Sequence, residues 1–253
     1  MRRAAAGLAL VVALVGCGER AYGPFEVDEI LVFAASSLTE TFHKIGNRFH
    51  KSGSALSGVR FHFASSSNLA TLIANGAHAD VFASASPMWM DAVERDPGVL
   101  ERVEFAKNKL IVIVPKSNPA DIDSFDDLTR PGVKLVLAAQ AVPAGQYARQ
   151  ALKKAGLVSA ERNVASNEED VKGVVQKVLL GEADAGIVYA TDVTGSVAEQ
   201  VAVVSIPDDV NVIASYSIAS IKTSEDLMAA TAFLDFVLEQ GRPYLRRAGF
   251  LDP

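Results

Sequence analysis

The chain of 253 residues is 49% hydrophobic and 21% charged, and its 24 Lys and Arg residues are outnumbered by 30 Asp and Glu. This acidic balance argues against nucleic acid and against an anionic membrane surface as partners. The only cysteine, Cys17, excludes an intramolecular disulfide bond. The length is compatible with one domain or with two.

The first residues have the pattern of an export signal. Met1-Arg2-Arg3 is a charged start, and the apolar run over residues 4–15 is too short to span a bilayer. The run ends in Leu-Val-Gly-Cys17, which resembles the lipobox of bacterial lipoproteins. The resemblance implies a signal peptide over residues 1–16, a lipid on Cys17 and a lipid-anchored tether over residues 17–27. A plain secretory signal that contains a cysteine is the alternative.

Removal of residues 1–16 leaves 22 basic residues against 30 acidic ones, a net charge of −8. The overall charge therefore cannot attract an anion, and any bound anion must be held by local, oriented dipoles.

After residue 27, apolar strands alternate with amphipathic helices, and no apolar run is long enough for a transmembrane helix. Strands are expected over residues 30–35, 59–64, 80–85, 108–114, 133–138, 185–190, 201–206 and 211–219. Helices are expected between them, with apolar residues recurring at helical spacing, as at Leu38, Phe42, Ile45 and Phe49. The alternation predicts an α/β fold with mostly parallel sheets, in which ligands bind at the carboxyl ends of strands.

Two of these strand–helix junctions are rich in serine. Residues 30–38 end in Ala-Ala-Ser-Ser37-Leu, and residues 61–70 contain Ala-Ser-Ser66-Ser, with no Lys or Arg in either segment. The first N–H groups of a helix lack intrahelical acceptors and favour negative charge, and serine hydroxyls add donors. We therefore predict an uncharged site for a small, fully ionised oxyanion. The ordinary alternative is helix capping, since Ser37 and Glu40 have the spacing of a capping box.

The second half of the chain offers three further candidate segments. Val142-Pro143-Ala144-Gly145 follows an apolar strand and opens a helix, and its small residues allow close approach to a ligand. Residues 166–169 (Ser-Asn-Glu-Glu) have capping-box spacing and lead into Val171, while Tyr189 ends a strand. Each segment also has a purely structural interpretation: a turn, a helix cap and a packed aromatic ring.

Taken in order, these segments resemble the periplasmic molybdate-binding proteins of ABC importers. The matching landmarks span essentially the whole chain after the signal, at residues 32–38, 63–67, 79–82, 89–91, 108–110, 142–145, 169–171, 186–189 and 248–250. The resemblance implies that hydroxyl and backbone groups of Ser37 and Ser66 bind molybdate or tungstate. Ala144 and Val171 would add backbone N–H groups, and Tyr189 its hydroxyl.

The resemblance also implies two α/β lobes of the periplasmic-binding-protein type, each a mixed, mostly parallel sheet flanked by helices, with a hinge between them. Lobe one would comprise residues 28–110 plus 207–253, and lobe two residues 111–206. The implied partner is the membrane permease of an ABC importer. A monomer without a cofactor is expected, in the periplasm or on the outer face of the cytoplasmic membrane.

Three segments depart from the family pattern, and the change at Ser84-Ala-Ser86 is expected to affect only a helix cap. Ser36 stands where the family often has alanine, which adds a hydroxyl near the site. Residues 138–141 (Ala-Ala-Gln-Ala) lack the acidic residue that commonly precedes the Val-Pro-Ala-Gly segment.

Two other functions stay open. The first is a binding protein for another tetrahedral oxyanion such as sulfate; a carboxylate ligand would call for an Arg clamp, and no candidate segment contains Arg. The second is a hydrolase-type enzyme in which Ser37 or Ser66 pairs with a histidine. Alternation along the strand places the His62 side chain within the sheet layer, and the Gly-x-Ser-x-Gly, His-Glu-x-x-His and Cys-x-x-Cys motifs are all missing from the sequence.

Overall fold

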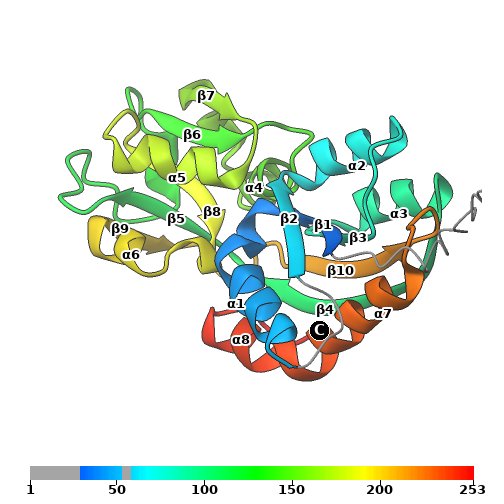
Figure 1. The fold of residues 1–253 in the computed structure, drawn as a ribbon. Coiled ribbons are helices and arrows are strands. Elements are labelled where there is room, and N and C mark those ends of the chain that lie inside the picture. Colours follow the sequence, from blue (N-terminus) through cyan, green and yellow to red (C-terminus); the bar gives the residue numbers. More distant parts are fainter. Residues whose placement is uncertain (1–28, 53–57) are drawn as a thin grey trace, which may run out of the picture.

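Two five-stranded sheets flanked by helices form the computed structural model, which describes residues 29–52 and 58–253 (Figure 1). The first sheet, in the order β2-β1-β3-β10-β4, defines lobe one, and the second, in the order β7-β6-β8-β5-β9, defines lobe two. The strands of lobe one are β1 (Glu29–Ala35), β2 (Gly58–Ala64), β3 (Val81–Ser84), β4 (Val99–Asn108) and β10 (Ala214–Ile221). Those of lobe two are β5 (Leu110–Pro115), β6 (Leu135–Ala138), β7 (Val164–Glu168), β8 (Ala185–Tyr189) and β9 (Val201–Ser205). The predicted two-lobed α/β fold is confirmed.

Helices cover both faces of the lobe-one sheet because alternate strand residues are apolar on both sides. Val32 of β1 packs into a core with α1 (Thr39–His50), α7 (Leu227–Phe236) and α8 (Arg242–Arg247), whereas Phe33 packs against α2 (Ser66–Ala74) and α3 (Pro87–Arg95) (Figure 1). In lobe two, α4 (Pro143–Lys154) and α5 (Val171–Leu179) pack on the sheet, and α6 (Ser196–Gln200) precedes β9.

Both sheets are mixed. In lobe one, β1 runs parallel to β2 and β3, while β10 runs antiparallel to β3 and β4. In lobe two, β6 runs parallel to β7 and β8, while β5 runs antiparallel to β8 and β9. The antiparallel strand of each lobe lies next to a crossover: β5 is the first strand after the chain enters lobe two, and β10 is the first strand after it returns to lobe one.

Two strands were absent from the sequence prediction. β4 carries charged residues along an edge of the sheet, including Glu101, Arg102 and Glu104, and β7 reads Val-Ala-Ser-Asn-Glu, so neither forms an apolar run. The strand expected over residues 108–114 is β5, which begins two residues later than expected, at Leu110, because β4 ends at Asn108. Edge strands are half-exposed, which weakens the periodic signal that reveals them.

The chain passes from lobe one to lobe two between β4 and β5 and returns between β9 and β10. Asn211 joins these two crossovers: its side chain accepts a hydrogen bond from Leu110 N at 3.2 Å and donates one to Leu110 O at 2.9 Å. Asn108 donates from its side-chain nitrogen to Thr191 Oγ1 at 2.8 Å. The boundaries near residues 110 and 207 stay a prediction.

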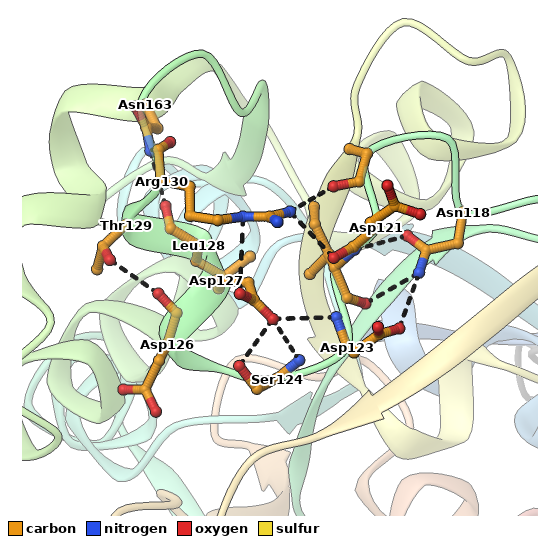
Figure 2. A network of polar contacts seen from close by, with 12 residues as sticks. Asn118, Asp121, Asp123, Ser124, Asp126, Asp127, Leu128, Thr129, Arg130 and Asn163 are labelled. Carbon is orange, nitrogen blue, oxygen red and sulfur yellow. Dashed lines mark hydrogen bonds and ion pairs between the residues drawn. The ribbon is translucent and has the colours of Figure 1, made fainter.

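A polar network fixes the loop that precedes β6 in lobe two (Figure 2). The Asp127 carboxylate accepts hydrogen bonds from the backbone and hydroxyl of Ser124 and from Asp123 N, and it lies 3.6 Å from Arg130 Nε. Asn163 donates to the carbonyl groups of Leu128 and Arg130. This network lies apart from the residues considered below as a site.

The predicted signal peptide (residues 1–16), the tether (residues 17–27) and the lipidated Cys17 lie outside the described residues. Among the described residues, none of the helices combines the length and apolar character that crossing a membrane requires. The same residues contain no group of three or more His, Cys, Asp or Glu side chains placed to hold a metal ion.

Candidate functional site

A small cavity lies between the lobes, where four helix starts meet. The space between its lining atoms, open solvent included, is about 200 Å³. The lining residues are Ala35, Ser36, Ser37, Ser65, Ser66, Ala85, Val142, Pro143, Ala144, Val171 and Tyr189. All five residues predicted to bind the ligand are among them, contributed by the turn that leads into α1, by the starts of α2, α4 and α5, and by the end of β8. The structure therefore brings together residues that are up to 152 positions apart, from Ser37 to Tyr189.

Ser37 lies in a 3₁₀ turn (Ser36–Leu38) that continues directly into α1. Its hydroxyl oxygen is 2.8 Å from Tyr216 Oη, and among the described residues it makes no capping bond to the start of α1. The capping-box interpretation of Ser37 is therefore wrong, and Glu40 instead points to lobe two. Ser37 is 3% exposed, so its hydroxyl is held in the wall of the cavity.

Ser66 is the first residue of α2, and the capping role belongs to its neighbour. The Ser65 hydroxyl accepts a hydrogen bond from Asn68 N at 3.3 Å, as an N-cap does. The Ser66 hydroxyl instead accepts from Ala85 N at 3.0 Å, which connects α2 to the end of β3. Ser66 therefore lines the cavity without acting as the N-cap of α2.

The lobe-two wall consists of the first residues of α4 and α5. Pro143 occupies the first turn of α4, where its missing N–H costs nothing, and Gly145 packs against the end of β6. Asp170 caps α5 by accepting from Gly173 N at 3.0 Å, so Val171 opens the helix toward the cavity. The expected cap at Ser166 is wrong: this residue lies in β7, and its hydroxyl donates to Glu168.

Tyr189 ends β8 with its ring buried, at 2% exposed. Within the described part of the chain, its hydroxyl is one of three buried polar side-chain atoms without a hydrogen-bond partner. Burial raises the pKa of Tyr189 well above its ordinary value, so the hydroxyl keeps its proton and remains a donor. Leaving such a group unpaired costs about 1–3 kcal/mol, which a ligand oxygen in the cavity would recover.

The cavity lining contains no charged side chain among the described residues. The nearest cation in sequence is Lys172, next to Val171, and it is already paired. Its Nζ lies 3.0 Å from both carboxylate oxygens of Glu40 and 3.3 Å from Asp192 Oδ1. Burial alone would lower the pKa of Lys172, but the two carboxylates outweigh this and raise it. The positive charge of Lys172 is thus balanced without the ligand.

Three contacts join the lobes around the cavity. Trp89 Nε1 donates to Ala141 O at 3.0 Å, Tyr147 Oη donates to Ala85 O at 3.4 Å, and Lys172 of α5 reaches Glu40 of α1. Each of these connects a helix or loop of one lobe to the other lobe.

Sequence reasoning did not find Tyr216 or Lys172 as neighbours of the site. Tyr216 lies in β10, where it reads as one more apolar residue of a buried strand, and its contact with Ser37 spans 179 positions. Lys172 follows a predicted site residue, but its partner Glu40 is 132 positions away. Tyr216 could have been identified in the sequence as a polar group on an otherwise apolar strand. The partners of Lys172 could not, because no local sequence pattern marks them.

The comparisons with known proteins agree with this geometry. Residues 30–251 match the family described as bacterial extracellular solute-binding protein. The molybdate-binding protein ModA of Mycobacterium tuberculosis (strain ATCC 25618 / H37Rv) is 39% identical over 253 residues, which cover 96% of this chain and 95% of that protein.

Two solved structures share the fold. The periplasmic molybdate-binding protein of Azotobacter vinelandii has a TM-score of 0.76 at 20% identity, covering 88% of this chain and 99% of its own. The sulfate-binding protein SubI of Mycobacterium tuberculosis H37Rv also has a TM-score of 0.76, at 18% identity, covering 88% of this chain and 86% of its own. These two likenesses show the fold alone, whereas the family match and the ModA relative cover nearly the whole sequence. The chain belongs to the bacterial extracellular solute-binding proteins, in the group that includes the molybdate-binding protein ModA.

Proposed function

We propose that this protein captures molybdate, and tungstate equally well, in the cavity between its lobes and delivers it to the membrane permease of an ABC importer. The observation that carries the proposal is an uncharged cavity at four helix starts that contains a buried, unpartnered phenol among the described residues. The ModA relative, 39% identical over nearly the whole chain, supports the choice of ligand.

Neutral donors are sufficient for such a ligand. A tetrahedral dianion without protons only accepts hydrogen bonds, and each bond to it is charge-assisted and stronger than a neutral pair. Burial of the dianion is costly unless its oxygens are all met by donors. Hydroxyls of Ser37, Ser66 and Tyr189, together with the N–H groups at Ala144 and Val171, provide donors from both lobes.

Sulfate is the main alternative, because SubI shows that the same fold can belong to a sulfate-binding protein. Sulfate is smaller than molybdate and would stretch hydrogen bonds in a cavity shaped for the larger ion. Molybdate and tungstate are nearly equal in size, so hydrogen bonding alone does not separate them. We therefore expect selection against sulfate by size and little selection between the two larger ions.

Isothermal titration calorimetry of the ligand-free protein tests this proposal. Molybdate and tungstate are expected to bind with similar micromolar or tighter dissociation constants, about −8 kcal/mol or better, and sulfate far more weakly. Sulfate bound as tightly as molybdate would contradict the proposal. Native mass spectrometry of the purified protein with the ligand it carries provides a second readout, and also tests the expected monomer.

We further propose that Cys17 carries a lipid that anchors the protein at the outer face of the cytoplasmic membrane. The Leu-Val-Gly-Cys17 pattern supports this proposal. Cys17→Ala is expected to release the protein from the membrane fraction without any change in molybdate affinity. A wild-type protein that takes up no labelled palmitate and fractionates as soluble would contradict the anchor.

A binding role, not hydrolysis, fits the family to which the chain belongs. The one Ser–His pairing considered from the sequence involves His62, whose side chain is exposed on β2 and packs against Phe33 with ring centroids 5.0 Å apart. The expectation that His62 lies inside the sheet layer is wrong, because β2 is an edge strand.

A further inference from the structure

We infer that Arg149, which lies outside the cavity lining, fixes the position of the lobe-two wall and thereby makes the site select its oxyanion by size. The inference rests on the proposed function, because it concerns how the same cavity separates molybdate from sulfate. Arg149 acts here as a positioning residue: it contacts the start of α4 and not the ligand.

One guanidinium nitrogen of Arg149 joins the two ends of the turn that leads into α4. Its Nη1 donates to Ala138 O, at the end of β6, at 2.8 Å and to Gly145 O, in the first turn of α4, at 3.0 Å. The proposed ligand donor, the N–H group of Ala144, lies between these two carbonyl groups along the chain. Arg149 therefore fixes both ends of the segment that carries this donor.

The guanidinium group is itself held by two further elements of lobe two. Its Nη2 donates to Asn167 Oδ1 of β7 at 2.5 Å, and its Nε lies 3.2 Å from Glu161 Oε1, in the 3₁₀ helix Val158–Asn163. The Arg149 side chain is 18% exposed, so these contacts are largely shielded from water. A planar fork of N–H donors can make all four contacts at once, which the compact ammonium group of a lysine cannot.

Gly145 limits movement of the α4 start in the opposite direction. A Cβ atom at this position would collide with the carbonyl groups of Ala138 and Ala139, so the helix start already touches the end of β6. Contact with β6 prevents a closer approach, and the bonds of Arg149 oppose separation. The N–H group of Ala144 is therefore fixed relative to the sheet from both directions.

The contacts of Arg149 differ from those that join the lobes. The bond from Trp89 to Ala141 O crosses between the lobes, so it requires the lobes to be together. All four contacts of Arg149 lie within lobe two and do not depend on closure. The lobe-two wall is thus set before a ligand arrives and does not adjust to each ion.

A wall that is set in advance selects by size. Sulfate is smaller than molybdate, and a donor that cannot follow the smaller ion makes a stretched hydrogen bond, which is weak. If the start of α4 could shift, the Ala144 donor would move toward sulfate and recover that bond. Loss of Arg149 should therefore favour sulfate relative to molybdate.

The experiment compares molybdate and inorganic sulfate by calorimetric titration of the ligand-free protein. Arg149→Met keeps much of the length of the side chain and removes all its donors. We expect the molybdate dissociation constant to rise about three- to tenfold and the ratio of the two constants, sulfate over molybdate, to fall about fivefold or more. An unchanged ratio would overturn the inference, even if both ions bind more weakly, because a merely structural role would lower both affinities together.

Arg149→Lys separates geometry from charge, and it also serves as the test if the methionine variant does not fold. Lysine keeps the positive charge beside Glu161 but not the planar fork, so the ratio is expected to fall in this variant too. A wild-type ratio in Arg149→Lys would overturn the inference, because the charge alone would then be sufficient.

Arg130→Met is the matched control. Arg130 fixes the loop before β6 in a similar way, by donating to Ala120 O and Asp121 O beside the Asp127 carboxylate (Figure 2), but it does not line the cavity. This variant should lower the thermal midpoint and keep the wild-type ratio of affinities. The same fall in both methionine variants would overturn the inference by assigning it to a general loosening of lobe two. Loss of molybdate binding by the wild-type protein itself would instead overturn the proposed function.

Discussion

Single residues at the cavity differ in whether a protein group already satisfies them. Ser66 accepts from a backbone amide and Ser37 contacts Tyr216, whereas the Tyr189 hydroxyl has no partner among the described residues. The hydroxyls of Ser37 and Ser66 therefore contribute to the stability of the empty protein, whereas the unpaired Tyr189 hydroxyl lowers that stability. The two kinds of residue can be separated by measuring stability and affinity together.

Tyr189→Phe is expected to weaken molybdate binding by one charge-assisted hydrogen bond, about 1.5–3 kcal/mol, or ten- to a hundredfold. The thermal midpoint of the empty protein should stay the same or rise, because an unpaired buried hydroxyl is removed. Calorimetric titration and thermal unfolding with and without molybdate measure both effects. Wild-type affinity in this variant would remove Tyr189 from the site.

The buried carboxyl of Asp192 makes the stability of the protein depend on pH, and the sign of this dependence can be predicted. Burial raises the pKa of the Asp192 carboxyl to about 6, with Lys172 opposing the rise. An Asp in the unfolded chain titrates near 3.9, so between these values the folded state holds a proton that the unfolded state lacks. The contribution of Asp192 to stability therefore increases as the pH falls from about 7 to about 4.

Urea unfolding of wild type and Asp192→Asn at several pH values measures this effect. The stability of wild type relative to the variant should rise by roughly 1–3 kcal/mol between pH 7 and pH 4. Asp127→Asn is the control with the opposite sign, because hydrogen bonds from Ser124 lower the pKa of Asp127. A relative stability of Asp192→Asn that does not vary with pH would contradict the prediction.

Local patterns in the sequence mark the segments that contain the five proposed ligand residues, because each segment ends a strand or opens a helix, but the choice of the five residues rests on the resemblance to the molybdate-binding family. The contacts that give them their properties could not be predicted. Whether Ser37 caps its helix or meets Tyr216 depends on the packing of β10 behind α1, which no local spacing encodes.

At the scale of elements, the site depends on helix starts that lie close against strand ends. Gly145 shows how close: a Cβ atom at this position would lie 2.1 Å from Ala138 O and 2.3 Å from Ala139 O. A side chain of any size would therefore push the start of α4 away from β6. The backbone N–H group of Ala144, a proposed ligand donor, would move together with the start of α4.

Gly145→Ala is expected to lower the free energy of unfolding by about 1–3 kcal/mol through overpacking and to weaken molybdate binding at least tenfold. Gly58→Ala is the matched control, because its added Cβ meets only the Glu29 side chain at 3.3 Å, which is able to turn aside. Denaturant unfolding and calorimetric titration measure both variants. Equal behaviour of the two alanine variants would show that the close approach at α4 is unimportant.

The elements that the sequence predicted well are those with strong apolar runs, such as β1, β8 and α1. β4 and β7 were missed because their exposed faces carry charged and polar residues, and their place at sheet edges is a property of the whole sheet. The antiparallel pairing of β5 and β10 was equally hidden, since strand direction depends on where the chain crosses between the lobes.

At the scale of the whole molecule, the two lobes meet around the ligand cavity through a few polar contacts. Among these, the ion pair between Glu40 and Lys172 directly links the two helices whose starts face each other across the cavity. Glu40 is half-exposed, so the pair adds little to folding stability. We therefore expect it to act on the opening of the lobes.

Glu40→Gln is expected to speed molybdate release severalfold while changing the free energy of unfolding by less than about 1 kcal/mol. Stopped-flow displacement of bound molybdate measures the release rate. Glu182→Gln removes a comparably exposed ion pair, to Lys177 within lobe two, and should leave the rate unchanged. The same acceleration in both variants would mean that charge alone, and not the link between the lobes, is responsible.

The side chain of Asn211 meets both backbone groups of Leu110 as a neighbouring strand would. We therefore expect the two crossovers to act as a single pivot in which both main-chain groups of Leu110 stay hydrogen-bonded while the lobes open. Turning about this pivot would then expose neither Leu110 group to water, and we expect the free-energy cost of opening to come from the contacts at the rim of the cavity. Substitutions at the rim should consequently change the rate at which the bound ion dissociates. Substitutions at Asn211 should instead change whether the two lobes move as rigid bodies.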